Sequence, residues 1–288
     1  MSDESDPAVL LERAQELAAT PTVYGADVFK DQVVLVSGGA GGIGLASCVL
    51  FGRLGATVVS CSRDPEKMAG LGAALDHLGI PNLTKAMTIR DPEQVNGLID
   101  DIWDRYGRLD VVVNNAGGQF AAPALDISPN GWNAVVDTNL NGTWYMTQAA
   151  AQHWTENKHP GCVINVVAVL DTCNSGIPHT MAARGGEIAL SKALSVEWGP
   201  QDIRINCIAV GVVESPGLAH YPPTARPSFD HNPMRRMGTV QDIAQACVYL
   251  AAPSGAFVNG SVLTVDGGAA NWGEYWPLGR PEYFNVDY

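Results

Sequence analysis

Short runs of apolar residues alternate along the chain with longer segments in which apolar residues recur every three or four positions. The apolar runs predict seven buried strands, at residues 33–37, 55–61, 83–89, 109–113, 162–167, 203–209 and 261–265. The periodic segments predict helices at residues 7–19, 45–54, 64–78, 91–103, 132–154, 181–198 and 239–252. Strands that alternate with helices in this way predict an α/β fold, a doubly wound parallel sheet with helices on both faces.

The seven predicted strands fall within residues 31–268, and no repeat or linker divides this range, so we expect a single domain. Residues 1–30 form a helical extension, which we expect to be an appendage or a subunit contact, or else a solvated helix with one apolar side. Residues 269–288 form a tail with six aromatic residues, Trp272, Tyr275, Trp276, Tyr283, Phe284 and Tyr288. We expect this tail to cover a neighbouring subunit or to cap a pocket, because so much aromatic surface favours burial.

The composition excludes several classes of partner. The 288 residues are 46% hydrophobic and 16% charged, as in a compact globular protein, and the net charge is −13. This acidic balance argues against a protein that follows the phosphates of a nucleic acid. The six cysteines include no C-x-x-C pair, so we expect no zinc or other metal site and a reducing, cytoplasmic location. The chain shows neither an apolar signal core nor a membrane-length apolar run, so we expect no membrane contact.

The most informative stretch is Ser-Gly-Gly-Ala-Gly-Gly-Ile-Gly, residues 37–44, which follows the first predicted strand and opens the next predicted helix. Glycines allow positive φ and let a phosphate approach the backbone without a Cβ in the way. The helix that begins there directs unpaired N–H groups and its positive dipole end at an anion. A strand, a glycine turn and a helix in this order therefore predict a dinucleotide site, and a purely structural glycine turn is the alternative.

Three motifs resemble the short-chain dehydrogenase/reductase family. Ser37-Gly38-x-x-x-Gly42-Ile43-Gly44 matches its T-G-x-x-x-G-I-G fingerprint, residues 114–117 match its N-N-A-G segment, and residues 266–268 match its terminal D-G-G. The resemblance covers residues 31–268 and implies a Rossmann-type sheet of about seven strands, an NAD(P)-dependent oxidoreductase and a homotetramer. The positions that it assigns to the cofactor are Ser37, Gly38, Gly42, Ile43, Gly44, Ser62, Arg63, Thr88, Asn115, Ala116, Gly117, Arg184, Gly211 and Val213.

The end of the second predicted strand favours NADPH over NADH. NAD-selective sites carry an acid about 20 residues past the glycines, whereas this chain has Ser62 followed by Arg63, a forked cation suited to a 2′-phosphate. The alternative is that Arg63 is a surface residue paired with Asp64. Thr88 stands where the family usually has an Asp that holds the adenine amine, and its hydroxyl can accept the same bond.

One branch of the family is most similar. Five segments resemble the trans-2-enoyl-CoA and 2,4-dienoyl-CoA reductases, namely residues 89–90, 117–120, 131–132, 138–143 and 146–147. That resemblance implies the NADPH-dependent reduction of an unsaturated acyl-CoA. Residues 214–237 hold five prolines and predict a substrate lid, in which Arg235 and Arg236 either meet CoA phosphates or are solvated surface charges.

The catalytic residues of the family are replaced. The family uses a Tyr as proton donor, a Lys four residues later that lowers the pKa of the Tyr, and a Ser that holds the substrate oxygen. In this chain the Tyr position falls on Thr180, the Lys position on Arg184 and the Ser position near Ala168. Ketone reduction by the usual route is therefore disfavoured, because a Thr hydroxyl is too weak an acid. Reduction of a 2-enoyl thioester gives an enolate that hydrogen bonds can stabilise.

The resemblance then implies a role for each candidate. Arg184 takes the role of the Lys and holds the nicotinamide ribose, while Thr180 and Asn141 donate hydrogen bonds to the thioester oxygen. Asn139 organises an active-site water, or is a buried amide that ties the helix to the sheet. His179 is a proton source, since its pKa lies near physiological pH, or a loop residue without a role.

Asp171 and Asp137 are further candidates for proton transfer. Two other functions stay open alongside the reductase. One is a hydroxyacyl-CoA or other alcohol dehydrogenase with a rearranged acid/base set. The other is a catalytically silent subunit that binds nucleotide or acyl-CoA beside an active partner.

Overall fold

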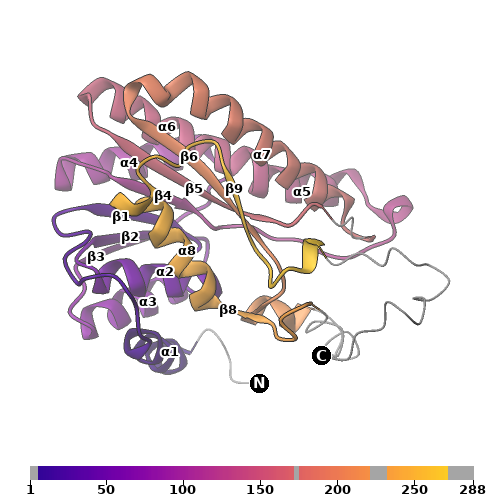
Figure 1. The fold of residues 1–288 in the computed structure, drawn as a ribbon, viewed down its shortest axis with the longest axis horizontal. Helices are drawn as coiled ribbons and strands as arrows, with labels where there is room; N and C mark the ends of the chain where they lie inside the picture. The colour runs from indigo at the N-terminus through magenta and orange to yellow at the C-terminus, as the bar shows by residue number, and fades with distance from the viewer. Residues whose placement is uncertain (1–5, 172–174, 221–231, 272–288) are drawn as a thin grey trace, which may run out of the picture.

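A seven-stranded parallel sheet forms the centre of the protein, as the sequence pattern predicts (Figure 1). The computed structural model describes residues 6–171, 175–220 and 232–271. The strand order is β3-β2-β1-β4-β5-β6-β9, with the bounds β1 Val33–Ser37, β2 Thr57–Ser62, β3 Asn82–Ala86, β4 Val111–Asn114, β5 Gly161–Ala168, β6 Ile203–Val210 and β9 Val262–Val265. Because every pairing is parallel, the carboxyl ends of all the strands lie at one edge of the sheet, where ligands bind in folds of this kind.

Helices cover both faces of the sheet (Figure 1). One core cluster joins the sheet to α1 (Pro7–Ala19), α2 (Gly42–Arg53), α3 (Pro65–His77) and α8 (Val240–Ala251). The other joins it to α4 (Pro92–Tyr106), α6 (Gly142–Asn157) and α7 (Pro178–Trp198). Strand β1 contributes Val34 and Val36 to the first cluster and Val33 and Leu35 to the second. A strand buried on both faces reads as a continuous apolar run, which is why the sequence marks β1 so clearly.

The predicted helix over 132–154 is in fact three consecutive elements. Helix α5 (Pro129–Val136) passes into a π-helical turn, η2 (Asp137–Asn141), and then into α6. Such a turn adds a single residue between two helices, and the apolar periodicity of the sequence does not resolve a shift of one position. Turns with this wider hydrogen bonding are frequent at functional sites. Here the turn carries Asn139 and Asn141, two of the predicted site residues.

The N-terminal helix α1 is packed onto its own chain, not left as a solvated appendage. Leu10 and Ala14 are buried in the core cluster with α2 and α3. The Arg53 side chain of α2 also donates hydrogen bonds to the carbonyl oxygens of Leu17 and Thr20, at 3.3 and 2.7 Å. The apolar face of α1 is thus buried against other helices of the same chain.

Some predicted features lie outside the described residues. These are the aromatic tail after Asn271 and the centre of the predicted lid, residues 221–231. The lid begins and ends at a pair of short parallel strands, β7 (Val213–Glu214) and β8 (Gly238–Thr239). Within the described ranges, no helix is both long and apolar enough to cross a membrane, and no three His, Cys, Asp or Glu side chains gather as a metal site would require.

The packing of α1 predicts the effect of a truncation in its apolar face. Replacing Leu10 with Ala should lower the free energy of unfolding by about 2–4 kcal/mol, because the side chain is buried between helices. The matched control is Val23→Ala, whose side chain is exposed in the same N-terminal segment and should change stability by less than about 0.5 kcal/mol. Chemical denaturation measures both. Equal, small effects would show that α1 does not belong to the cooperative core.

Candidate functional site

The glycine loop closes tightly on itself. Gly38 and Gly42 have φ angles of 72° and 51°, in the left-handed region that favours glycine. A Cβ on Gly44 would lie 2.1 Å from the carbonyl oxygen of Gly38, so a side chain cannot be accommodated there. The first turn of α2 therefore lies directly against the end of β1.

Helix α2 begins without a side-chain cap. Its N-cap is Gly41, which has no capping oxygen. By contrast, α3, α4 and α8 begin at Asp64, Asp91 and Thr239, each of which accepts a hydrogen bond from a backbone N–H of the first turn. The N–H groups at the start of α2 thus remain available to an anion, and a Cβ on Gly41 would meet no atom within 4 Å. Both observations fit the pyrophosphate of a dinucleotide.

The end of β4 supports this loop from beneath. The Ser37 hydroxyl accepts hydrogen bonds from the backbone N–H groups of Asn115 and Ala116, at 3.1 and 3.0 Å. The Asn115 side-chain amide donates in return to the carbonyl oxygens of Ser37 and Gly38, both at 3.1 Å. These bonds join four of the predicted cofactor positions, at the ends of β1 and β4, into one rigid unit.

Arg63 lies at the end of β2, next to the half-buried Ser62. Its side chain is exposed and has neither a hydrogen bond nor an ion pair with any described residue. Asp64 does not pair with Arg63 but accepts hydrogen bonds from the N–H groups of Glu66 and Lys67 at the start of α3. The guanidinium is thus available to a ligand, and the expected alternative of an Arg63–Asp64 pair is not what the structure contains.

A second arginine lies near the glycine loop, and sequence reasoning missed it. Arg13 of α1 lines a small cavity together with Ala40 and Gly41 of the loop. The glycine loop contains no basic residue, so the sequence of the loop does not predict a cation there. Helix α1 packs beside the loop and places Arg13, about 27 residues upstream of Ala40, next to it. Only the tertiary structure reveals this placement.

The remaining cofactor positions surround the same edge of the sheet. The Thr88 hydroxyl accepts a hydrogen bond from the N–H of Arg90 at 3.3 Å. Gly211 follows β6 and lies against Asp266, since a Cβ on Gly211 would be 2.7 Å from the Asp266 Cα. Val213 is buried in β7, and the Cβ of Ser215 lies 3.6 Å from where a Cβ on Gly42 would be. The loop after β6 thus lies beside the glycine loop.

Arg184 faces the loop that follows β4. Its Nη1 donates to Glu187 Oε1 at 2.7 Å, and its side chain is only 11% exposed. Its Nη2 lies 2.2 Å from the position that a Cβ on Gly117 would occupy, and Asn139 Oδ1 lies 3.1 Å from that same position. The structure therefore brings Arg184, Asn139 and Gly117 together.

Asn139 and Asn141 are already engaged within the chain. The Asn139 amide donates to the carbonyl oxygen of Gly118 at 3.1 Å and accepts from the N–H of Gly118 at 3.0 Å. The Asn141 amide donates to Asp137 Oδ1 at 2.9 Å. Asn139 thus ties the π-helical turn to the loop after β4, and the water-organising role stays a prediction.

His179 and Thr180 present buried polar atoms that lack partners. His179 Nδ1 faces the backbone N–H of Thr180 at 2.9 Å and accepts its hydrogen bond, so in the neutral ring the proton is on Nε2. That Nε2 and the Thr180 hydroxyl are both buried, and neither has a hydrogen-bond partner among the described residues. The ring of Phe120, from the loop after β4, packs edge-on against His179 at 4.5 Å. Unpartnered buried donors are costly, so they indicate a place where a ligand or water completes the bonding.

Glu187 is a buried site residue that sequence reasoning missed. Its carboxylate is fully buried, and burial raises its pKa to about 7 against the opposing effect of the Arg184 guanidinium. Glu187 Oε2 and the neighbouring Thr143 hydroxyl both lack a hydrogen-bond partner among the described residues. The signal was present in the sequence, because residues 184 and 187 are one helical turn apart and carry opposite charges.

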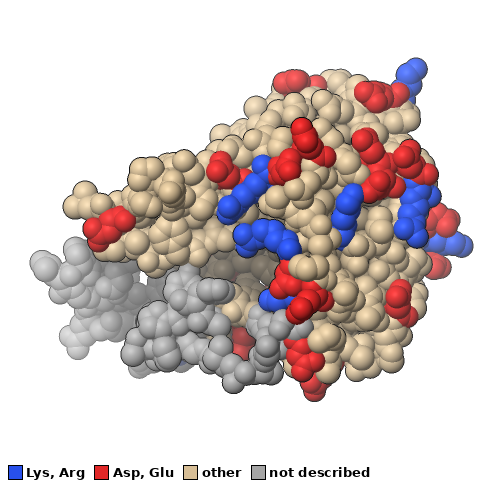
Figure 2. All heavy atoms as spheres, turned by 180° about the vertical axis from the view of Figure 1, so that it is seen from behind, with Lys and Arg blue, Asp and Glu red and all other residues tan. Residues whose placement is uncertain are grey.

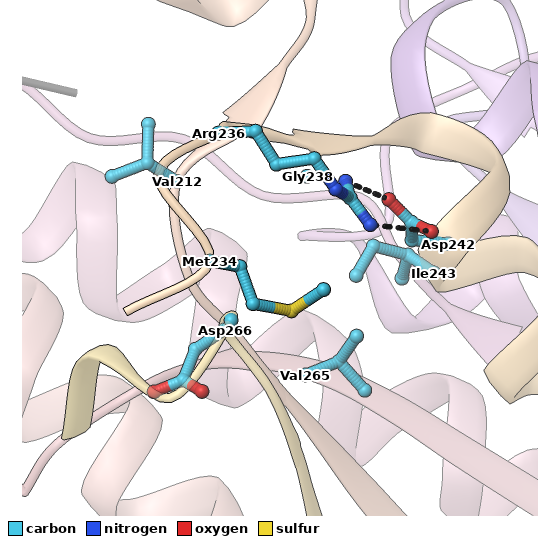
Figure 3. A pocket seen from close by; sticks show the side chains of 9 residues that line it. Val212, Met234, Arg236, Gly238, Asp242, Ile243, Val265 and Asp266 are labelled. Carbon is cyan, nitrogen blue, oxygen red and sulfur yellow. Dashed lines mark hydrogen bonds and ion pairs between the residues drawn. The ribbon is translucent and has the colours of Figure 1, made fainter. Parts of the chain in front are cut away.

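The other acidic and basic candidates lie away from this group. Asp171 is exposed after β5. Arg236 makes an ion pair with Asp242 at 2.8 Å, which holds the pKa of the Asp242 carboxyl below its ordinary value. This pair borders a cavity of about 160 Å³, opposite Val265 and Asp266 (Figure 3). None of the predicted catalytic residues lines that cavity, and the Arg236 charge is already compensated.

The surface charge on one face of the protein is mixed. On the face shown in Figure 2, Lys and Arg side chains alternate with Asp and Glu and form no continuous basic surface. This face therefore shows no stripe of positive charge of the kind that binds the phosphates of a nucleic acid.

Two comparisons with known proteins identify the family. A family model described as Enoyl-(Acyl carrier protein) reductase matches residues 38–270. The crystal structure of a short chain dehydrogenase from Bacillus anthracis is 36% identical, with a TM-score of 0.76, and the match covers 86% of this chain and 99% of that one. The chain belongs to the short-chain dehydrogenase/reductase family. It is therefore an oxidoreductase of a family that uses NAD(P)(H).

Members of the family with different chemistries are similarly close to this chain. A Bacillus subtilis (strain 168) protein named "Probable 2,4-dienoyl-CoA reductase" is 32% identical over 243 residues, which are 82% of this chain and 96% of the relative. The Thermotoga maritima 3-oxoacyl-acyl-carrier-protein reductase FabG is 30% identical over 241 residues, which are 82% of this chain and 97% of the relative. Because the two identities are so close, the chemistry of the site has to decide between these reactions.

The buried carboxyl of Glu187 predicts a pH-dependent stability. The unfolded chain releases this proton near the ordinary value of 4.5, whereas the folded protein keeps it up to about 7, so the free energy of unfolding falls as pH rises across this interval. A Glu187→Gln variant has no carboxyl at this position, so its free energy of unfolding does not fall for this reason as pH rises. The stability of the variant minus that of the wild type should therefore rise by up to about 3 kcal/mol between about pH 5 and about pH 8.

Denaturant unfolding at the two pH values measures this difference. The exposed Glu197 on the same helix supplies the control, because Glu197→Gln should follow the wild type at both. A Glu187→Gln difference that does not change with pH would mean that the folded protein holds Glu187 ionised throughout.

Proposed function

We propose that the protein is an NADPH-dependent reductase of an unsaturated acyl thioester, either a 2-enoyl-CoA or a 2,4-dienoyl-CoA. The observation that carries this proposal is the set of groups at the usual Tyr and Lys positions. There, Thr180 and the adjacent His179 offer buried hydrogen-bond donors that have no partner among the described residues, and Arg184 offers a permanent cation beside Gly117. These groups can hold a negatively charged oxygen, but none matches the Tyr that protonates an alkoxide in the family's usual ketone reduction.

The cofactor binds along the edge of the sheet from the glycine loop to Arg184. The uncapped N-terminus of α2 receives the pyrophosphate, and Arg63 receives the 2′-phosphate of NADPH. Arg13 is a second cation near the loop. Arg184 holds the nicotinamide ribose, with Gly117 leaving room for its guanidinium. The cofactor supplies the hydride.

The substrate oxygen is held by the donors on α7. Hydride addition to the β-carbon of a 2-enoyl thioester, or to the δ-carbon of a dienoyl thioester, moves the electron pair toward the thioester oxygen. Thr180 and the Nε2–H of His179 stabilise that charge by hydrogen bonds, with no proton transfer to oxygen required. A proton delivered to carbon by water or by another acid then completes the reduction. Asn141 contributes to this site once its bond to Asp137 is exchanged for one to substrate.

Loss of NADPH absorbance with a panel of acyl-CoAs tests the proposal directly. The panel holds 2-enoyl, 2,4-dienoyl and 3-ketoacyl thioesters, with NADH run in parallel. Turnover of the enoyl or dienoyl member is expected. Turnover of the ketoacyl member alone would replace the proposal with a ketoreductase, and nucleotide binding without any turnover would favour a catalytically silent subunit.

The role of Arg63 predicts the nucleotide preference. Arg63→Ala should lower kcat/KM with NADPH by about tenfold or more, because a charge-assisted contact to the 2′-phosphate is lost, and should leave NADH turnover unchanged. Arg105→Ala is the control, since that arginine lies in the last turn of α4, away from the glycine loop. An equal loss with both nucleotides would place Arg63 outside the 2′-phosphate site.

Substitutions of Thr180 and Arg184 should have different effects, one on the chemical step and the other on cofactor binding. Thr180→Ala should lower kcat by about 100-fold, the usual effect of removing a hydrogen bond to a developing oxyanion, while the KM for NADPH stays unchanged. Arg184→Ala should instead raise the KM for NADPH. Thr155→Ala, an exposed threonine on α6, serves as the control. Full turnover in both Thr180→Ala and Arg184→Ala would refute this assignment of the site.

A further inference from the structure

Arg184 is held from two sides by its own chain. On one side, Glu187 Oε1 accepts a hydrogen bond from Nη1 at 2.7 Å. On the other, Nη2 occupies the space beside Gly117, 2.2 Å from where a Cβ would begin. One edge of the guanidinium fork is therefore committed to the helix, and the other is presented to the loop after β4. Gly117 itself is exposed, so a ligand can reach this side.

An arginine at this place needs such support more than a lysine would. The guanidinium is planar and presents its donors in fixed directions, so its orientation decides which of them reach a ligand. The side chain also has many rotamers, and an unrestrained Arg would lose entropy on binding. A carboxylate one helical turn away fixes the plane before any ligand arrives.

Glu187 is well suited to be that restraint, because Arg184 is the group with the largest stabilising effect on its carboxylate, ahead of the neighbouring Thr143. It is fully buried, and a buried carboxyl is retained in a core only where it has a specific partner. Its charged partner is Arg184, whose Nη1 donates to Oε1, while the neighbouring Thr143 hydroxyl also lowers its pKa but makes no hydrogen bond of full geometry to Oε2. Glu187 lies farther along α7 than Arg184, away from Thr180 and His179, and therefore acts on the site through Arg184.

We propose that Glu187 is a positioning residue that fixes the Arg184 guanidinium against Gly117, so that Arg184 meets the nicotinamide ribose half of the cofactor in a preorganised orientation. This inference rests on the proposed binding of NADPH. It assigns to Glu187 an effect on the nicotinamide half alone, because the adenosine half binds at the glycine loop and Arg63.

Two substitutions disturb Arg184 from opposite sides. At about pH 8, above the Glu187 pKa of about 7, Glu187→Gln removes the charge of the restraint with almost no change of shape, so the binding measurements are made at that pH. Gly117→Ala places a methyl group where Nη2 lies, and the backbone at Gly117 does not have the positive φ that would itself strain an alanine. The control is Gly185→Ala, on the residue next to Arg184, where the methyl would make an ordinary contact at 3.6 Å with Leu170.

Direct binding measurements with two probes test the proposal. NADPH binding is followed by its fluorescence, and binding of 2′,5′-ADP, which lacks the nicotinamide half, by calorimetry. Glu187→Gln and Gly117→Ala should each raise the Kd of NADPH by about tenfold, as expected for the loss of a well-oriented bond from a charged group, and should leave the Kd of 2′,5′-ADP unchanged. Because both act through Arg184, the double variant should lose about tenfold as well, not about a hundredfold.

Three results would overturn the inference. The first is a wild-type Kd for NADPH in the Glu187→Gln variant. The second is an equal rise in the Kd values of NADPH and 2′,5′-ADP. The third is a rise in the Kd of NADPH of about a hundredfold in the double variant. If Glu187→Gln does not fold, Gly117→Ala with its Gly185→Ala control still tests the orientation of Arg184. A wild-type protein that binds neither probe would instead refute the proposed NADPH site itself, which separates the two failures.

Discussion

The close approach of the first turn of α2 to the end of β1 is the constraint on which the site depends. Gly44 can lie against the Gly38 carbonyl only because it has no side chain, and Gly38 itself has a positive φ and lies against Ala116. Any Cβ at residue 44 would push the helix away from the sheet. The helix would then no longer direct its uncapped N–H groups at the strand edge, and the bonds from Asn115 to Ser37 and Gly38 would lose their geometry. One steric fact thus fixes the loop, its support and its anion-binding direction.

The parallel sheet extends this constraint to the rest of the site. Since all strands end at one edge, the loops after β1, β2, β4 and β6 meet there, although they are far apart in the sequence. Helix α7 packs against β5 and β6 and brings His179 and Arg184 to the loop after β4. The π-helical turn before α6 contributes Asn139, whose amide bonds both polar groups of Gly118. The site is thereby held by backbone contacts and not by side-chain packing alone.

Much of this could be predicted from the sequence, and the reasons for the remainder are physical. Buried strands such as β1 carry a continuous apolar run, and capped helices such as α3 carry an Asp followed by a Pro, so local pattern was sufficient for the fold. The π-helical turn was missed because it shifts the apolar pattern by only one position, which periodicity does not resolve. The docking of α1, and with it the position of Arg13 beside the loop, depends on tertiary contacts that no local pattern encodes. Whether His179 Nε2 has a partner also depends on the packed structure, because burial and hydrogen bonding are properties of the surroundings.

The replacements at the catalytic positions are understood best as one change. In the family's usual site the Lys has two tasks, to hold the ribose and to lower the pKa of the Tyr. When Thr180 takes the place of the Tyr, the second task disappears, and under the proposed function a permanent cation such as Arg184 can serve the first as well as a Lys. A larger buried guanidinium then needs a counter-charge and a fixed orientation, because an unpaired buried charge is strongly destabilising. Glu187, one turn later on α7 and fully buried, fixes the guanidinium through its hydrogen bond and supplies the counter-charge once it ionises near pH 7. The loss of the Tyr, the exchange of Lys for Arg and the presence of a buried acid are therefore mutually consistent, and together they fit the reduction of a carbon–carbon double bond better than that of a ketone.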